Sequence, residues 1–233
     1  MIPPLEIWHA RHRHRSIPTP VETTHTLTTV PLGAIESGVT ARPAQIDGCT
    51  ALRIELTDEI TTHGAPGMDY VDQPTFLRLA TLFRTGSITV EILSRLNHKT
   101  TFDSRAFAGL AFHITDDPTT FASVYLRPLN GRRLQPPPPR DQRAVQYFAY
   151  PAHPFDRLRE HFPDGRYEAG ANITPSEWIT LRVEVSDELV TATIDDDRVL
   201  TVAPLAPART GDVGLFVDIG TEAFFRNLHI IAN

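Results

Sequence analysis

The sequence predicts an all-β fold, a sandwich of two antiparallel sheets with jelly-roll topology. Three observations on its 233 residues lead to this prediction. Threonine, valine and isoleucine, which favour strands, are frequent, and 20 prolines separate short segments, whereas helix signals are scarce. Strand patterns recur at short, even spacing with Asp, Gly and Pro between them, which is typical of a sandwich or barrel.

Alternation of apolar and polar residues identifies the individual strands. In residues 50–56, Leu52, Ile54 and Leu56 share one face, and residues 86–96 alternate in the same way. Residues 106–114 are apolar on both faces, so we expect this strand at the centre of a sheet. We also expect Trp178 to be buried with its strand. The other expected strands cover residues 24–30, 75–81, 121–127, 143–150, 178–185, 190–194, 200–202, 213–219 and 223–231.

The expected organisation is an N-terminal arm, residues 1–20, followed by a single jelly-roll domain, residues 21–233. Two insertions flank the strand at 143–150. Residues 130–142 contain four consecutive prolines and predict an exposed, extended loop, because proline cannot join a strand ladder. Residues 155–162, inside the second insertion, predict one or two helical turns that could cover a cleft.

Composition excludes several classes of partner. The net charge of −6 argues against nucleic acid or an anionic membrane, because both require a positive face. Cys49 is the only cysteine, so no internal disulfide can form. No apolar run approaches membrane-spanning length, and residues 1–20 lack the apolar centre of a signal peptide. We therefore expect a cytoplasmic protein with a small-molecule or carbohydrate ligand, and the oligomeric state stays open.

Several segments carry a family resemblance. The most specific are Gly-x-Val-Gly-Leu at 211–215 and Phe-Arg-Asn-Leu at 225–228, and segments 83–91, 108–113, 125–128 and 178–185 add to them. In this pattern, which covers roughly two-thirds of the chain, the sequence resembles the bacterial 3-keto-disaccharide hydrolase domain family. That family belongs to the concanavalin A-like lectin and glucanase superfamily. The resemblance implies a jelly roll that binds its ligand on the concave sheet, but these segments are scaffold and do not define a reaction.

A glucanase is not predicted. The glucanases of this superfamily resemble one another in a strand of the pattern Glu-x-Asp-x-x-Glu or Glu-x-Asp-x-Glu, and the equivalent stretch here, residues 91–95, contains Glu91 alone. Hydrolysis by the usual retaining or inverting route requires two carboxyl groups that flank the glycosidic bond.

The candidate site residues are polar side chains expected on one sheet face. His113 and Glu91 are the candidate catalytic bases. The candidate substrate-binding residues are Tyr125, Arg127, Gln146, Tyr147 and Arg157. The face of the strand 143–150 is left open, because either Gln146 or Tyr147 could point into the cleft. The competing structural interpretation is an ion pair between Arg127 and Glu91, with His113 as a strand-end residue.

These residue types fit one reaction. In a 3-keto sugar the C2 proton is acidic, so a base could remove it while a cation stabilises the enolate and the leaving group departs by elimination. On this hypothesis Arg127→Ala abolishes binding but costs no more than about 1 kcal/mol of stability, as for a surface change.

No cofactor or metal is predicted. The chain lacks a phosphate-binding glycine loop, a nucleophile elbow and zinc-ligand spacing. His9, His12 and His14 are interleaved with arginines, which repel a dication, and the aspartates at 116–117 and 195–197 are typical of turns. The leading hypothesis is an enzyme acting on a glycoside or modified sugar. A non-catalytic ligand-binding domain and a natural-product tailoring enzyme remain the alternatives.

Overall fold

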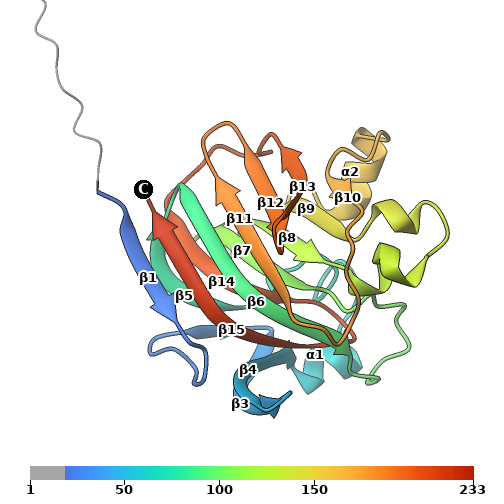
Figure 1. Ribbon diagram of the computed structural model, residues 1–233, viewed down its shortest axis with the longest axis horizontal. Coiled ribbons are helices and arrows are strands. Elements are labelled where there is room, and N and C mark those ends of the chain that lie inside the picture. The colour runs from blue at the N-terminus through green and yellow to red at the C-terminus, as the bar shows by residue number, and fades with distance from the viewer. Residues whose placement is uncertain (1–18) are drawn as a thin grey trace, which may run out of the picture.

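Two antiparallel β-sheets stack on one another in the computed structural model, which describes residues 19–233 (Figure 1). Strands account for 48% and helices for 10%, which confirms the predicted jelly-roll sandwich. Most of the expected arm and the three N-terminal histidines lie outside the described residues. Among the described helices, none is both long and apolar enough to cross a membrane.

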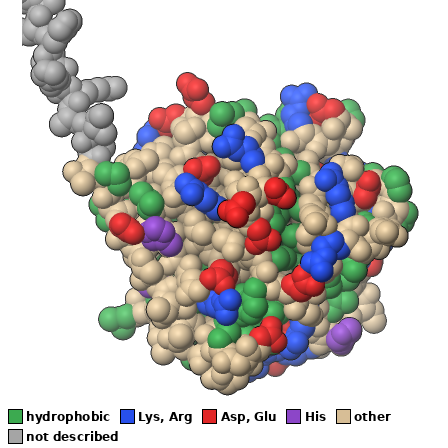
Figure 2. Space-filling view, viewed as in Figure 1, with side chains coloured by type: hydrophobic (Ala, Val, Ile, Leu, Met, Phe, Trp, Pro, Cys, Tyr) green, Lys and Arg blue, Asp and Glu red, His purple; other side chains and the backbone are tan. Residues whose placement is uncertain are grey.

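The first sheet has eight strands within residues 19–233, and β1 pairs with β15 beside the main path. Its order is β13 (Asp197–Val202), β12 (Val190–Ile194), β11 (Ile179–Val185), β6 (Gly86–Leu96), β15 (Thr221–Ala232), β4 (Cys49–Leu56) and β3 (Val39–Ile46), with β1 at Val21–His25. β6 and β12 have the bounds that the sequence predicted. On the outward face, acidic and basic side chains are interspersed (Figure 2).

The second sheet has seven strands in the same described part. Its order is β10 (Glu168–Ala169), β9 (Val145–Tyr150), β8 (Phe121–Leu126), β7 (Ala108–Ile114), β14 (Gly211–Val217), β5 (Phe76–Phe83) and β2 (Ile35–Ser37). β7 is fourth in this order and every one of its residues is buried, which confirms its predicted central place.

Short helices lie in the connections. α1 (Asp58–His63) begins at Thr57, whose hydroxyl accepts a hydrogen bond from the Ile60 N–H, as an N-cap does. α2 (Phe155–His161) confirms the helical turns expected there. The proline-rich connection is not the extended loop that we predicted. It contains 3₁₀ turns at Pro128–Asn130, Arg132–Leu134 and Arg140–Gln142.

The core lies between the sheets and follows the predicted alternation. Ile88, Val90 and Ile92 of β6 are fully buried. Trp178 is only half-buried, contrary to prediction. It precedes β11 on the opposite face from Ile179, and its ring packs against the Arg226 guanidinium at 4.0 Å.

Candidate functional site

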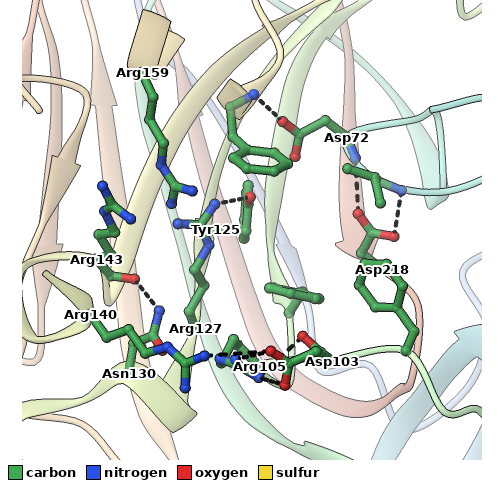
Figure 3. Close-up of a pocket in the computed structure, with 14 residues that line it drawn as sticks. Asp72, Asp103, Arg105, Tyr125, Arg127, Asn130, Arg140, Arg143, Arg159 and Asp218 are labelled. Carbon is green, nitrogen blue, oxygen red and sulfur yellow. Dashed lines mark hydrogen bonds and ion pairs between the residues drawn. The ribbon is translucent and has the colours of Figure 1, made fainter. Parts of the chain in front are cut away.

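A cavity of about 400 Å³ opens at the end of β8 and β14, and segments distant in sequence line it (Figure 3). β8 and the residue after it supply Tyr125 and Arg127. The loop before β5 supplies Asp72, the residue after β14 is Asp218, and α2 supplies Phe155 and Arg159.

Arg127 is the buried cation of this cavity. Its Nη1 atom donates to Oε1 of Glu168 at 2.6 Å, and both side chains are 5% exposed. Its Nη2 atom donates to the Tyr125 hydroxyl at 2.6 Å and to Oε1 of Gln146 at 3.1 Å. A buried charge requires such compensation, because transfer out of water is costly unless hydrogen bonds and an opposite charge replace the solvent.

Tyr125 sits where it does because β7 has a glycine opposite it. In the ladder Gly109 pairs with Tyr125, and a Cβ atom on Gly109 would lie 2.4 Å from the Tyr125 Cα atom. Burial raises the pKa of Tyr125 well above its ordinary value, so the phenol keeps its proton. Since the hydroxyl oxygen accepts from Arg127, its O–H remains able to donate.

Asp218 holds the loop that carries Asp72. Its Oδ1 atom accepts from the backbone N–H groups of Val71 at 3.0 Å and Ile219 at 2.7 Å, and its Oδ2 atom accepts from that of Asp72 at 2.9 Å. Burial raises the pKa of Asp218, and these hydrogen bonds offset part of the effect. The role of this carboxylate is to position the loop.

Asp72 is the acid–base candidate of the cavity. Its Oδ2 atom accepts from the Phe155 N–H at 2.6 Å, whereas the buried Oδ1 atom has no hydrogen-bond partner among the described residues. Burial and the neighbouring charge of Asp218 raise the pKa of Asp72 to about 7, because the hydrogen bond from the Phe155 N–H, the charge of Arg127 and the Tyr125 hydroxyl offset them only in part. A carboxyl poised near neutral pH can both accept and return a proton.

Further arginines surround the opening. Arg159 donates to both oxygens of Glu168, at 3.0 and 2.6 Å, and Arg143 lies 3.3 Å from the same carboxylate. Although burial alone would raise the pKa of Glu168, hydrogen bonds from Arg159 and the charge of Arg127 hold it below the ordinary value. Glu168 is therefore an anion that organises three guanidinium groups, and not a candidate acid.

Three residues of the predicted site come together. Tyr125, Arg127 and Gln146 form one hydrogen-bonded group, since Gln146 is the register partner of Tyr125 in β9. Of the two residues between which the sequence left the face open, Gln146 shares the face of Tyr125, but neither Gln146 nor Tyr147 lines the cavity. Gln146 does not line the cavity but supports Arg127 from behind.

His113 and Tyr147 do not lie in this cavity, contrary to the expected single cleft. Both line another hollow of about 210 Å³, and the Tyr147 hydroxyl accepts from the Leu205 N–H at 3.2 Å. His113 has a φ of 59°, and the register between β7 and β14 shifts at this end, so the side chain leaves the expected face. Its Nε2 atom lies 2.7 Å from the Arg84 carbonyl oxygen, and burial lowers its pKa.

Glu91 lies in the other sheet, also contrary to the expected single cleft. It is on β6, where its carboxylate pairs with Arg226 at 2.6 Å and accepts from Asn227 at 2.6 Å. The alternative pairing with Arg127 is wrong as well, because the partner of Arg127 is Glu168. Arg157 is exposed on α2 and does not line the cavity, whereas Arg159, two residues later, does.

The described residues contain no group of three or more His, Cys, Asp or Glu side chains that could hold a metal ion. The chemistry that the cavity itself can supply is proton transfer by Asp72, hydrogen-bond donation by Tyr125, and positive charge from the arginines.

Comparison with known proteins identifies the fold. No family model matches the chain, and no curated protein matches its sequence. A carbohydrate-binding module, CBM66 from Bacillus subtilis, superposes with a TM-score of 0.51 at 13% identity over 83% of this chain and 94% of that one. A Bacillus subtilis protein of unknown function with a galectin-like fold gives 0.51 at 10% identity over 92% and 96%.

A β-1,3-1,4-glucanase (lichenase) derived from a mouse hindgut metagenome gives a TM-score of 0.50 at 11% identity, over 91% of this chain and 98% of that one. The chain therefore has the jelly-roll fold of galectin-like and concanavalin A-like domains. The narrower resemblance to 3-keto-disaccharide hydrolases stays a prediction.

Proposed function

We propose that this protein is a carbohydrate-active enzyme that binds a glycoside or a modified sugar in the Arg127 cavity and uses Asp72 as its acid–base residue. The observation that carries the proposal is the Asp72 carboxyl group: it is buried, it lines the cavity, and its Oδ1 atom has no partner among the described residues. A buried acceptor without a partner is costly unless a ligand or water satisfies it.

The lining of the cavity suits a saccharide. Asn130 supplies a second buried acceptor, Oδ1, that lacks a partner among residues 19–233, and sugar hydroxyls can donate to both acceptors. Phe102, Phe107 and Phe155 supply apolar walls for the C–H faces of a sugar ring. Structures of the same fold include the carbohydrate-binding module and the lichenase named above, which favours a sugar ligand by analogy of fold.

Elimination is the reaction that these residues support best. The Asp72 carboxylate removes the C2 proton of a 3-keto glycoside, and the C–H electron pair forms the enolate. Tyr125 and Arg127 stabilise the negative charge on the enolate oxygen. The enolate then expels the C1 substituent, which leaves with the proton that Asp72 returns. Hydrolysis through two carboxyl groups is less favoured, because Asp218 is already bonded to three backbone N–H groups.

A second candidate is a non-catalytic carbohydrate-binding domain. The hydrogen bonds of Arg127 favour this second candidate. Two of its nitrogens already donate to Glu168, Tyr125 and Gln146, so the guanidinium is held in place before a ligand binds. A guanidinium that the protein already holds in place is what a rigid binding site requires.

The test uses 4-nitrophenyl glycosides and their 3-keto derivatives with the wild type and the Asp72→Asn variant. We expect turnover of a 3-keto substrate by the wild type, and loss of at least about a hundredfold in the variant, the lower range for a general base. Binding of the substrate should persist. Binding without turnover by the wild type would favour the second candidate. Full activity of Asp72→Asn would overturn the role of Asp72.

A further inference from the structure

The cavity has more positive than negative charge. Arg105, Arg127, Arg140, Arg143 and Arg159 line it. The two carboxylates that pair with these five guanidinium groups are Glu168 and Asp103. Asp72 and Asp218 also line it, but even with both ionised the five arginines exceed the four acids. This excess contrasts with the net charge of −6 of the whole chain.

Arg143 is one of the weakly compensated cations of this cavity. Its closest acid is Glu168, at 3.3 Å, and Glu168 already accepts three shorter hydrogen bonds from Arg127 and Arg159. Within residues 19–233 its Nη atoms donate to no protein acceptor. Partial burial and the charge of Arg159 lower the pKa of Arg143, so the protein surroundings disfavour this cation where it stands.

Arg140 and Arg159 extend the same feature. Arg140 reaches Asp103 only at 3.5 Å, and Asp103 is already bonded to Arg105. Arg159 uses Nε and Nη2 on Glu168, which leaves its Nη1 atom without a protein acceptor in the described chain. Figure 3 shows Arg159 and Arg143 extending from different segments toward the side of the cavity where Arg127 lies.

We infer that this cavity selects a ligand bearing an anionic group, a carboxylate or a phosphate, which the free donors of Arg143 and Arg159 bind. The planar fork of a guanidinium matches both groups, and charge-assisted hydrogen bonds are the strong ones. The inference rests on the proposed function in one respect: if the ligand is a sugar, it is an acidic sugar. The neutral part of the ligand then lies toward Asp72 and the phenylalanine walls.

The test compares four probes, namely D-glucose, D-glucuronate, D-glucose 1-phosphate and inorganic phosphate. Binding is followed by NMR of the arginine side-chain Nε–H groups in the wild type, Arg143→Gln and Arg182→Gln. Arg182 is the matched control, because it is an exposed arginine paired with Glu184 on the other sheet. The removal of Arg182 changes the net charge equally but leaves the cavity intact.

We expect saturable binding of D-glucuronate or D-glucose 1-phosphate at the cavity, with about tenfold loss in Arg143→Gln and no loss in Arg182→Gln. Which of the two binds distinguishes carboxylate from phosphate. Binding of inorganic phosphate alone at Arg143 would support the anion site and contradict the saccharide function. Binding of D-glucose as strongly as D-glucuronate would overturn the anion inference and leave the proposed function standing. No binding of any probe would overturn the anion inference, and turnover of the 3-keto substrates would then test the proposed function separately.

Discussion

The Asp72 carboxylate accepts a hydrogen bond from the Phe155 backbone N–H, with Oδ2 and N 2.6 Å apart. This bond joins the loop before β5 to the first residue of α2, so the candidate acid also holds one wall of its own cavity. Phe155 in turn packs against the guanidinium groups of Arg127 at 5.5 Å and Arg159 at 4.7 Å. The protonation state of Asp72, the position of α2 and the arginines are therefore coupled by direct contacts.

Asp72 should make the stability of the protein depend on pH. Its folded pKa of about 7 exceeds the ordinary 3.8, so the folded state binds the proton more tightly than the unfolded state. Stability should then fall as pH rises from about 4 to about 7. Asp72→Asn removes this penalty, so the variant should gain on the order of a few kcal/mol over the wild type at pH 8 and much less at pH 5. Urea unfolding at the two pH values measures this, and an equal difference at both would contradict the expectation.

Asp218→Asn should loosen the loop that carries Asp72. An amide has one acceptor oxygen, so it cannot accept from the N–H groups of Val71, Asp72 and Ile219 as the carboxylate does. We expect faster amide hydrogen exchange at Val71 and Asp72, with the β8 ladder unchanged. Asp212→Asn, at the other end of β14, is the control and should leave both amides unaffected. Unchanged exchange at Val71 and Asp72 in Asp218→Asn would show that the carboxylate does not hold the loop.

Arg127→Ala should destabilise the protein strongly. The sequence suggested a surface change, but Arg127 is 4% exposed and paired with the buried Glu168. Removal of one partner leaves the other charge buried and uncompensated, which costs about 3–5 kcal/mol. Arg182→Ala, which breaks an exposed pair, should cost about 0.5 kcal/mol or less. Chemical denaturation of both variants decides this, and a similar small cost for the two would mean that Arg127 is effectively solvated.

Glu91→Gln should leave the cavity unaffected. Glu91 and Arg226 form a pair that is about one-quarter exposed, on the sheet opposite Tyr125 and Arg127. We expect unchanged binding of any cavity ligand and a stability cost within about 1 kcal/mol. Calorimetric titration with the tightest binder among D-glucose, D-glucuronate, D-glucose 1-phosphate and phosphate measures the affinity. A tenfold loss of affinity in Glu91→Gln, with the fold intact, would show that Glu91 contributes to ligand binding.

The fold was predictable because apolar and polar residues alternate locally along its strands. β6 and β12 have the predicted bounds, and β7 is central as its apolar density indicated. β3 (Val39–Ile46) was missed because it is an edge strand with Pro43 in its interior and mostly polar or exposed positions. Proline is tolerated on an edge strand, where one row of N–H groups has no partner strand.

The site was predictable only in part, because its acids acquire their character from distant contacts. The charge of Asp218, 146 residues away, helps to raise the pKa of Asp72, and the N–H of Phe155, 83 residues away, donates to its carboxylate. Asp218 did carry a local signal, since it is a charged residue within the apolar run at 213–219. The position of His113 could not be inferred, because a bulge with positive φ reverses the alternation on which the prediction depended.

The pKa of Asp72 in the folded protein tests the central claim most directly. Selective ¹³C labelling of aspartate carboxyls, with Asp72→Asn to assign the resonance, allows titration of this group by NMR. The account predicts a midpoint near pH 7, because burial and Asp218 together hold the proton on Asp72. A midpoint near pH 4, the ordinary value for an aspartate, would contradict an acid–base role for this residue.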